Sequence, residues 1–302
     1  MTLDLRYCSQ EIASAQRVLI VGGDSTIGSA LNKRLLGEGY QVTYSTRRTG
    51  IQGEHFIYLD LRDRSTFLSV IGHHFDTAVL CGSVTSIEKC EENPEITRQV
   101  NVDGTLALAS LLRDSGCHLV FISTNMVFDG SKTHVQASDA ACPVTEYGRQ
   151  KVAVEEALLT PFYQASIIRF GKIVPAGFPL FSEWLQRLRA GYHIYPYHDR
   201  NMAPISLAFA TDILVWLITQ KRNGIFQVTA DSEITYADAA YRIACFIHAD
   251  TSLIEPSKST SGLCISGKKL PIPAHTSLQF STEFEPYFNA PPPDEALRYF
   301  VG

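Results

Sequence analysis

A tyrosine and a lysine four residues apart are the side chains of this sequence with the clearest chemistry. They are Tyr147 and Lys151 of the segment YGRQK, in a stretch from about Thr145 to Leu159 whose spacing predicts a helix. Side chains four residues apart share a helical face, so the ammonium can approach the phenol and lower its pKa from about 10. Such a phenol can donate a proton to a carbonyl oxygen that is being reduced. The same spacing also occurs by chance in helices without this chemistry.

A hydroxyl able to hold that carbonyl follows the strand predicted over His118 to Ser123 (HLVFIS). Thr124 is the preferred candidate and Ser123 the second, because both stand at the carboxyl end of this strand. The alternative is that these hydroxyls only cap the end of the strand.

A glycine-containing turn follows the first predicted strand, Val18 to Val21, and leads into a helix predicted from Ile27 to Gly37. Small residues in such a turn let backbone N–H groups reach a pyrophosphate at the helix N-terminus. The spacing fits G-x-x-G-x-x-G with serine at the middle glycine, and simple turn chemistry is the alternative. The predicted cofactor-binding residues of this turn are Gly22, Asp24, Ser25, Thr26, Ile27 and Gly28.

Two arginines, Arg47 and Arg48, follow the next predicted strand, QVTYST. An NAD-selective fold usually carries an acidic residue about 20 residues past the glycines, whereas no carboxylate stands near this strand end. Guanidinium groups bind a 2′-phosphate through paired hydrogen bonds, so the combination favours NADP(H). Solvated loop arginines are the alternative. Asp60, after the third strand, is placed either to accept from the adenine amino group or to cap the segment after it.

Short apolar runs alternate with amphipathic segments through the first half of the chain, including a long helical region expected from about Ile96 to Ser115. This alternation predicts an α/β fold, a Rossmann doubly wound parallel sheet with a smaller C-terminal substrate-binding subdomain. The NADP-binding Rossmann domain is expected over 1–170 together with 205–230. The substrate-binding subdomain is expected over 171–204 and 231–302.

Composition excludes several classes of function. A formal net charge of −5 argues against a general nucleic-acid surface. No apolar run approaches the roughly 20 residues of a membrane span, and the N-terminal residues lack a secretion signal. The cysteines have neither C-x-x-C pairs nor metal spacing, so we expect reduced thiols, no metal site and a cytoplasmic protein. They are Cys8, Cys81, Cys90, Cys117, Cys142, Cys245 and Cys264.

Taken together, these motifs resemble the extended short-chain dehydrogenase/reductases, and most of all the dTDP-4-dehydrorhamnose reductase-like branch. The matching features are VLIVGGDSTIG, Asp60, NVDGT, FISTNMVFDG, YGRQKVAVE and DRNMAPIS, in family order. The resemblance implies a Thr124/Tyr147/Lys151 triad, NADPH, and a keto-bearing nucleotide-diphosphate sugar of deoxysugar biosynthesis as substrate. It also implies a homodimer. Further cofactor contacts are expected from Leu61, Cys81, Gly82, Ser83, Asn101 and Phe170, besides Tyr147 and Lys151.

Several positions depart from the family pattern. Ser25 is expected to narrow the pyrophosphate site without abolishing it. Asn125 and Met126 stand where the pattern S-T-D-Y-V-F-D-G has Asp and Tyr, and where related sugar 4,6-dehydratases have an Asp-Glu pair. Because these side chains cannot act as acid and base, reduction is expected rather than dehydration. Gln150 replaces the usual Ser or Thr before the lysine and is not expected to be essential.

Two other functions remain open at this point. A nucleotide-sugar epimerase generally holds NAD tightly, so Arg47 and Arg48 count against it. A non-catalytic regulatory subunit would bind the cofactor without turnover. The intact triad argues against this role, and the altered Asn125-Met126 pair leaves it open.

Overall fold

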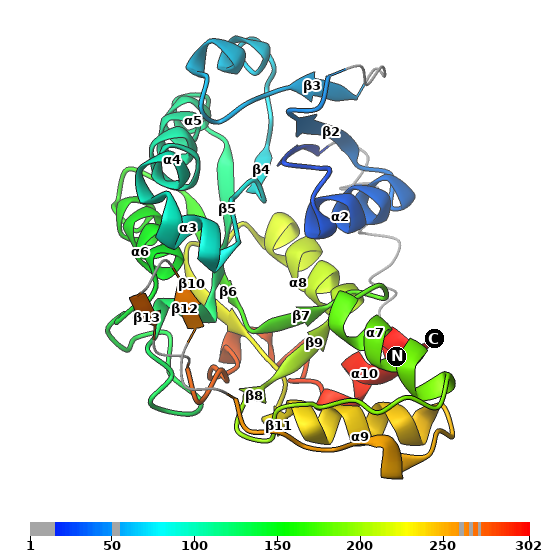
Figure 1. Ribbon diagram of the computed structural model, residues 1–302. Coiled ribbons are helices and arrows are strands. Elements are labelled where there is room, and N and C mark those ends of the chain that lie inside the picture. Colours follow the sequence, from blue (N-terminus) through cyan, green and yellow to red (C-terminus); the bar gives the residue numbers. More distant parts are fainter. Residues whose placement is uncertain (1–15, 50–54, 260–262, 266–267, 271–272) are drawn as a thin grey trace. The chain divides into compact units, whose positions relative to one another are not determined.

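The computed structural model describes residues 16–49, 55–259, 263–265, 268–270 and 273–302 (Figure 1). A seven-stranded sheet has the order β10-β6-β5-β4-β1-β2-β3, and the pairs from β5 across to β3 are parallel. In chain order its strands are β1 (Arg17–Val21), β2 (Gln41–Thr46), β3 (Phe56–Tyr58), β4 (Thr77–Leu80), β5 (His118–Thr124), β6 (Ala165–Phe170) and β10 (Gly224–Val228). The apolar interiors of β1 and β5 follow from burial on both faces.

Helices cover both faces of this sheet (Figure 1). On one side lie α2 (Thr26–Gly37) and α8 (Leu207–Gln220). On the other lie α4 (Pro94–Arg98), α5 (Thr105–Asp114) and α6 (Glu146–Leu158), with the short α3 (Ile87–Glu92) and η1 (Arg64–Ser69) in the connections. The predicted doubly wound α/β architecture is confirmed.

The order of the strands reverses at β1, which pairs with β2 on one side and with β4 on the other. Val18, for example, is in register with both Val42 and Thr77. In open α/β sheets, ligands bind outside the carboxyl ends of the strands at such a switch point. The fold therefore directs attention to the residues that follow β1, β2 and β4.

The long helical region expected from about Ile96 to Ser115 is confirmed, but its middle is π-helical. The structure has α4, then a π-helical segment η2 (Gln99–Gly104), and then α5. A Cβ on Gly104 would collide with the Leu61 carbonyl oxygen, so the backbone passes closer to the chain after β3 than an ordinary residue permits. π-turns of this kind recur at functional sites, and this one contains Asn101, one of the predicted site residues.

The chain divides into two compact units. The first comprises the described part of Met1–Ser123 with Arg149–Ile168 and Thr211–Ile225. Its core is aliphatic and is built from buried residues of the strands and their covering helices, among them Leu19, Ala78, Leu108, Leu119 and Ile167.

The second unit comprises Thr124–Gly148, Arg169–Ala210 and Phe226–Gly302. β7 (Lys172–Val174) pairs with β9 (Pro204–Ser206), β8 (Asn201–Met202) with β11 (Ile234–Thr235), and β12 (Leu263–Ile265) with β13 (Lys268–Leu270). Its helices are η3 (Asn125–Val127), α7 (Pro179–Arg189), α9 (Tyr236–Phe246), η4 (Thr251–Leu253), η5 (Thr282–Phe284) and α10 (Pro293–Val301). Phe181, Trp184, Ile243 and Leu297 pack together in its core.

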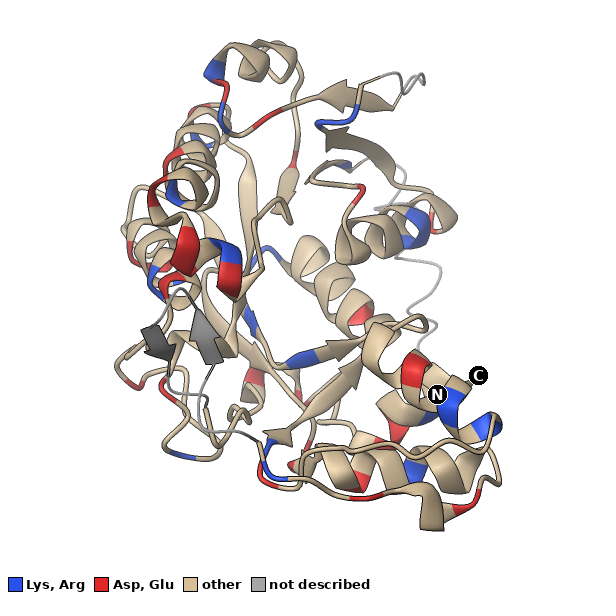
Figure 2. Cartoon of the chain, viewed as in Figure 1, with Lys and Arg blue, Asp and Glu red and all other residues tan. Residues whose placement is uncertain are grey.

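Charged side chains of both signs are scattered over the elements in Figure 2 instead of gathering on one of them. Within the described residues, no helix combines the length and the apolar character needed to cross a membrane. Cys81, Cys117, Cys142 and Cys245 are free thiols. Cys8, the N-terminal segment and the side chain of Cys264 lie outside the described part of the chain.

Candidate functional site

A groove in the first unit lies at the switch point, where β1, β2 and β4 end. It is lined by Val21, Gly22, Asp24, Ser25, Ser45, Thr46, Arg47, Leu59, Asp60, Leu61, Cys81, Gly82, Ser83, Val84 and Val100. The structure thus brings many of the predicted cofactor residues to one surface, from stretches of chain up to sixty residues apart in sequence. Their role as cofactor ligands stays a prediction. Ser45, Thr46, Leu59, Val84 and Val100 were not singled out from the sequence.

The turn after β1 requires glycine for steric reasons. Gly22 has φ +77°, and a Cβ there would lie 2.8 Å from the Cα of Gly82. A Cβ on Gly28 would contact the Gly22 carbonyl oxygen. The Gly22 amide donates to the Ser45 hydroxyl at 3.1 Å, which ties the turn to the end of β2. The approach of backbone to backbone leaves the groove wall without side-chain bulk, as a bound pyrophosphate needs.

Ser25, the departure from the glycine pattern, is the N-cap of α2. Its hydroxyl accepts a hydrogen bond from the Gly28 amide at 3.1 Å. Serine at an N-cap satisfies a helix donor that glycine would leave to solvent. Thr26, Ile27 and Gly28 form the first turn of α2 and do not line the groove, whereas Ser25 does.

The two arginines after β2 have different surroundings. Arg47 lines the groove. Arg48 is not among the lining residues. Its Nε lies 3.0 Å from a carboxylate oxygen of Asp24, and its side chain is 71% exposed. Arg47 is therefore the better placed of the two to bind an anionic group in the groove.

Asp60 is held by an arginine that the sequence did not single out. The Nη2 of Arg62 donates to one carboxylate oxygen at 2.7 Å, and its backbone N and Nε donate to the other at 3.0 and 3.2 Å. The Arg62 hydrogen bonds keep the pKa of Asp60 below its usual value, although burial opposes them. Asp63, and not Asp60, caps the helical segment η1, so the capping alternative for Asp60 is wrong.

Asn101 braces the segment that continues β4 along the groove. Its Oδ1 accepts from the Ser83 hydroxyl at 2.9 Å and from the Val84 amide at 2.7 Å, and its Nδ2 donates to the Val84 carbonyl at 2.9 Å. The same Nδ2 lies 2.8 Å from Oε1 of Gln150, which is fully buried. Gln150 also donates to Thr97 at 3.0 Å, so the residue expected to be dispensable links α6 to α4 and η2.

Lys151 is buried at the end of β5, with 4% of the residue exposed. Its Nζ donates to the Ile122 carbonyl at 2.8 Å and lies 4.6 Å from the centre of the Phe121 ring. Burial lowers the pKa of this amine to about 8, and the nearby Glu155 carboxylate opposes that shift. Burial also raises the pKa of the Cys81 thiol to about 12, so the groove is lined by a protonated thiol and not by a nucleophilic thiolate.

Thr124 is the last residue of β5, and its hydroxyl has two local partners. It accepts from the Met126 amide at 3.2 Å and donates to Oδ1 of Asn125 at 3.3 Å. Thr124 thereby caps η3, so part of the capping alternative holds for this residue. The Ser123 hydroxyl, the second candidate, donates instead to the buried carboxylate of Glu155.

Tyr147 is the second residue of α6, one helical turn before Lys151. Phe170, another predicted cofactor contact, ends β6 as a buried residue and does not line the groove of the first unit. Beside it, the Cζ atom of Arg169 lies 5.0 Å from the centre of the Phe128 ring, and its Nη1 donates to Oε1 of Gln227 at 3.3 Å. In the part of the chain that the structure describes, no cluster of His, Cys, Asp and Glu has the arrangement of a metal site.

Comparison with known proteins places these features in context. The family described as RmlD substrate binding domain matches residues 16–284. A "probable low-salt glycan biosynthesis reductase Agl14" of Haloferax volcanii is 26% identical over 250 residues, 79% of this chain and 82% of that protein. A dTDP-4-keto-6-deoxy-D-glucose reductase of Streptomyces niveus is 27% identical over 247 residues, 80% of this chain and 83% of that protein.

A similar solved structure is the dTDP-4-dehydrorhamnose reductase of Bacillus anthracis in complex with NADP. The two chains superpose with a TM-score of 0.82, over 95% of this chain and 98% of that one, at 19% sequence identity. At this identity the likeness establishes a shared fold.

Proposed function

Because the chain belongs to the RmlD substrate binding domain family, we propose that it is an NADPH-dependent short-chain dehydrogenase/reductase that reduces a keto group on a nucleotide-diphosphate sugar. The relative from Streptomyces niveus is named for reduction of a dTDP-4-keto-6-deoxy sugar, and the one from Haloferax volcanii for a reductase of glycan biosynthesis. The observation that carries the proposal is Lys151, a buried amine fixed to the Ile122 carbonyl one helical turn beyond Tyr147.

The residues of the groove fit the cofactor. Gly22 and Gly82 approach so closely that a Cβ on the first would fill the space beside the second, which suits a pyrophosphate bound at the start of α2. Arg47 would bind the 2′-phosphate, since no carboxylate stands at the end of β2 to prefer a free hydroxyl. Asp60 would face the adenine. When bound, NADPH supplies the hydride.

The protein's own part of the reaction is to hold the carbonyl oxygen and to give it a proton. The Thr124 hydroxyl holds the oxygen, and the Tyr147 phenol donates its proton as the oxygen gains charge. Tyr147 is left as a phenolate, which the Lys151 ammonium stabilises from the next helical turn. The Ile122 carbonyl keeps that ammonium in place. No carboxylate takes part, so Asn125 and Met126 are compatible with reduction.

The second unit would carry the sugar, within the proposed substrate-binding subdomain of 171–204 and 231–302. An epimerase is the weaker alternative, because a groove with Arg47 and without an acidic residue after β2 favours NADP(H) over tightly held NAD.

The first experiment is NADPH oxidation with a panel of nucleotide 4-keto-6-deoxy sugars. We expect turnover by the wild type, and a fall in kcat of roughly a hundredfold to ten-thousandfold in Tyr147→Phe, the range that a general acid supplies. NADPH binding, measured by fluorescence, should be retained in the variant. A wild type that binds NADPH and consumes none with any member of the panel would overturn the proposal and favour a regulatory role.

The rate should also fall as the pH rises through about 8. Lys151 acts as a cation, and its pKa lowered to about 8 means that the charge is present below this pH and lost above it. The Glu155 carboxylate raises this pKa, so Glu155→Gln should move the alkaline limb of kcat/KM to lower pH. If the alkaline fall of kcat/KM occurs at the same pH in Glu155→Gln as in the wild type, the assignment of that fall to Lys151 is wrong.

Selection between cofactors should depend on Arg47 and not on Arg48. Arg47→Ser is expected to raise the KM for NADPH about tenfold to a hundredfold, the range for lost charge-assisted hydrogen bonds, with little change for NADH. Arg48→Ser is the matched control, because Arg48 is not among the residues that line the groove and its guanidinium is paired with Asp24. Equal effects of the two substitutions would show that the 2′-phosphate site is not centred on Arg47.

The proposal includes a homodimer and a cytoplasmic location. Pairing of helices across a two-fold axis is common in the family that the sequence resembles, and the free thiols suit a reducing compartment. Sedimentation equilibrium should therefore give twice the 33.5 kDa mass of one chain. A particle of single-chain mass at micromolar concentration would remove the dimer from the proposal.

A further inference from the structure

A line of three hydrogen bonds in the second unit connects a buried carboxylate to the Thr124 hydroxyl. The Thr124 hydroxyl donates to Oδ1 of Asn125 at 3.3 Å, and Nδ2 of Asn125 donates to the Thr276 carbonyl at 3.2 Å. The Thr276 amide in turn donates to Oε1 of Glu233 at 2.6 Å. Asn125 and Thr276 are 151 residues apart in sequence, so the fold alone brings them together.

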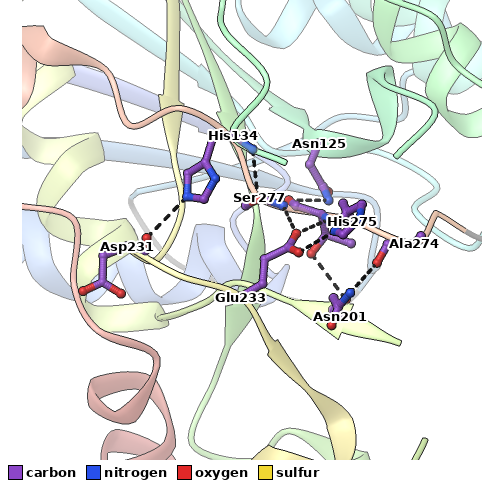
Figure 3. A network of polar contacts seen from close by, with 9 residues as sticks. Asn125, His134, Asn201, Asp231, Glu233, Ala274, His275 and Ser277 are labelled. Carbon is purple, nitrogen blue, oxygen red and sulfur yellow. Dashed lines mark hydrogen bonds and ion pairs between the residues drawn. The ribbon is translucent and has the colours of Figure 1, made fainter. Parts of the chain in front are cut away.

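Residues 273–281, called the strap below, form the middle of this line (Figure 3). The strap runs beside the loop after η3: the His275 amide donates to the Gly130 carbonyl at 3.1 Å, and Leu278 forms a parallel bridge with Val135. Asn201 holds its start, with Nδ2 2.9 Å from the Ala274 carbonyl. The strap is therefore fixed at several points against the segment that begins with Asn125.

Glu233 fixes the centre of the strap. Its side chain is 11% exposed, and its carboxylate accepts from the Thr276 and Ser277 amides at 2.6 and 2.7 Å and from Nδ1 of His275 at 2.8 Å. Burial opposes ionisation, but these hydrogen bonds hold the pKa of Glu233 below its usual value. Three donors on one carboxylate leave the Thr276 carbonyl little freedom to move away from Asn125.

The position of Asn125 demands an amide. The Thr276 carbonyl is only an acceptor, so its partner must donate, while the Thr124 hydroxyl needs an acceptor. An amide presents its NH2 group to the Thr276 carbonyl and its oxygen to the Thr124 hydroxyl. The Thr276 carbonyl therefore determines the orientation of the amide. An ionised Asp, the residue of the family pattern at this position, would set a carboxylate oxygen against that carbonyl.

We propose that Asn125 is a positioning residue for Thr124, and that Glu233, through Thr276, sets the orientation of its amide. The inference rests on the proposed reductase function. The Thr124 hydroxyl has one hydrogen, and Asn125 Oδ1 holds it where the carbonyl oxygen of the substrate will accept it. The Met126 amide keeps the hydroxyl oxygen in place. At 3.3 Å the bond to Asn125 is long, so the hydrogen passes to a better-placed substrate oxygen at little cost.

Asn125→Asp tests the role, with Asn201→Asp as its matched control. Both substitutions place a carboxylate against a carbonyl of the strap. The Asn201 amide donates to the Ala274 carbonyl of the strap and makes no hydrogen bond to Thr124. We expect kcat on the keto sugar to fall roughly tenfold to a hundredfold in Asn125→Asp, with KM within about twofold. Asn201→Asp should lower kcat by a clearly smaller factor than Asn125→Asp, because its amide is not hydrogen-bonded to Thr124. Equal losses of kcat in the two variants would overturn the proposal in favour of a purely structural strap.

Two further measurements separate positioning from folding. In a Thr124→Val background, Asn125→Asp should cause no additional loss of kcat, because the group it positions is gone. The ratio of wild-type kcat to that of Asn125→Asp should shrink as the pH falls from 8 to 5, since a protonated Asp again donates to Thr276 and accepts from Thr124. Glu233, His275, Tyr147 and Lys151 are present in both proteins, so the ratio compares variant and wild type at the same pH.

Additive losses in the double variant, or a ratio independent of pH, would overturn the role of Asn125. Thermal melting and NADPH binding of each variant establish that it is folded. If Asn125→Asp does not fold, Glu233→Gln replaces it, with the same expected fall in kcat and the same cycle with Thr124→Val. A wild type without activity on any keto sugar defeats the proposed function and this inference with it. A fully active Asn125→Asp in an active wild type defeats the inference alone.

Discussion

The burial of the Lys151 ammonium is the interaction on which the surrounding structure depends. A buried charge costs several kcal/mol unless polar groups replace its water. Here the Ile122 carbonyl accepts from it, the Phe121 ring lies 4.6 Å from its Nζ, and the Glu155 carboxylate favours its charged form. The first two of these groups belong to β5. Helix α6 is therefore restricted to one register against that strand. The neighbouring Gln150 and Glu155 reinforce this register, since they bond to η2 and to the end of β5.

Close backbone approach gives the groove of the same unit its shape. Gly22 against Gly82, and Gly104 against the Leu61 carbonyl, bring the turn after β1, the end of β4 and η2 nearer than side chains would allow. The η2 segment then delivers Asn101 to the continuation of β4, where its amide satisfies two donors and one acceptor. The wall of the groove thus owes its shape to glycines that allow close backbone contacts, and the buried Asn101 amide holds it in place.

The sequence was sufficient for the succession of the main strands along the chain and for most of the residues that line the groove. Strands buried on both faces leave continuous apolar runs, and a glycine turn has a local signature. The π-helical segment within the helical region from Ile96 to Ser115 had no such signature, because it accompanies the contact of Gly104 with a carbonyl more than forty residues away. Ser45 was missed for a similar reason, since only the pairing of β1 with β2 brings its hydroxyl to the Gly22 amide. The strap contacts of Asn125 are longer in range still.

Three of the departures from the family pattern share one physical feature: the side chains of Ser25, Gln150 and Asn125 each have a partner that the usual residue would not serve in the same way. Ser25 caps α2, Gln150 reaches Asn101 and Thr97, and Asn125 bridges a hydroxyl and a carbonyl. Such matched substitutions are what a retained function requires, whereas decay would leave polar atoms unsatisfied. Reduction uses only a proton donor, a cation and a hydroxyl from the protein. An amide after the threonine therefore removes the acid needed for elimination and leaves every group needed for reduction.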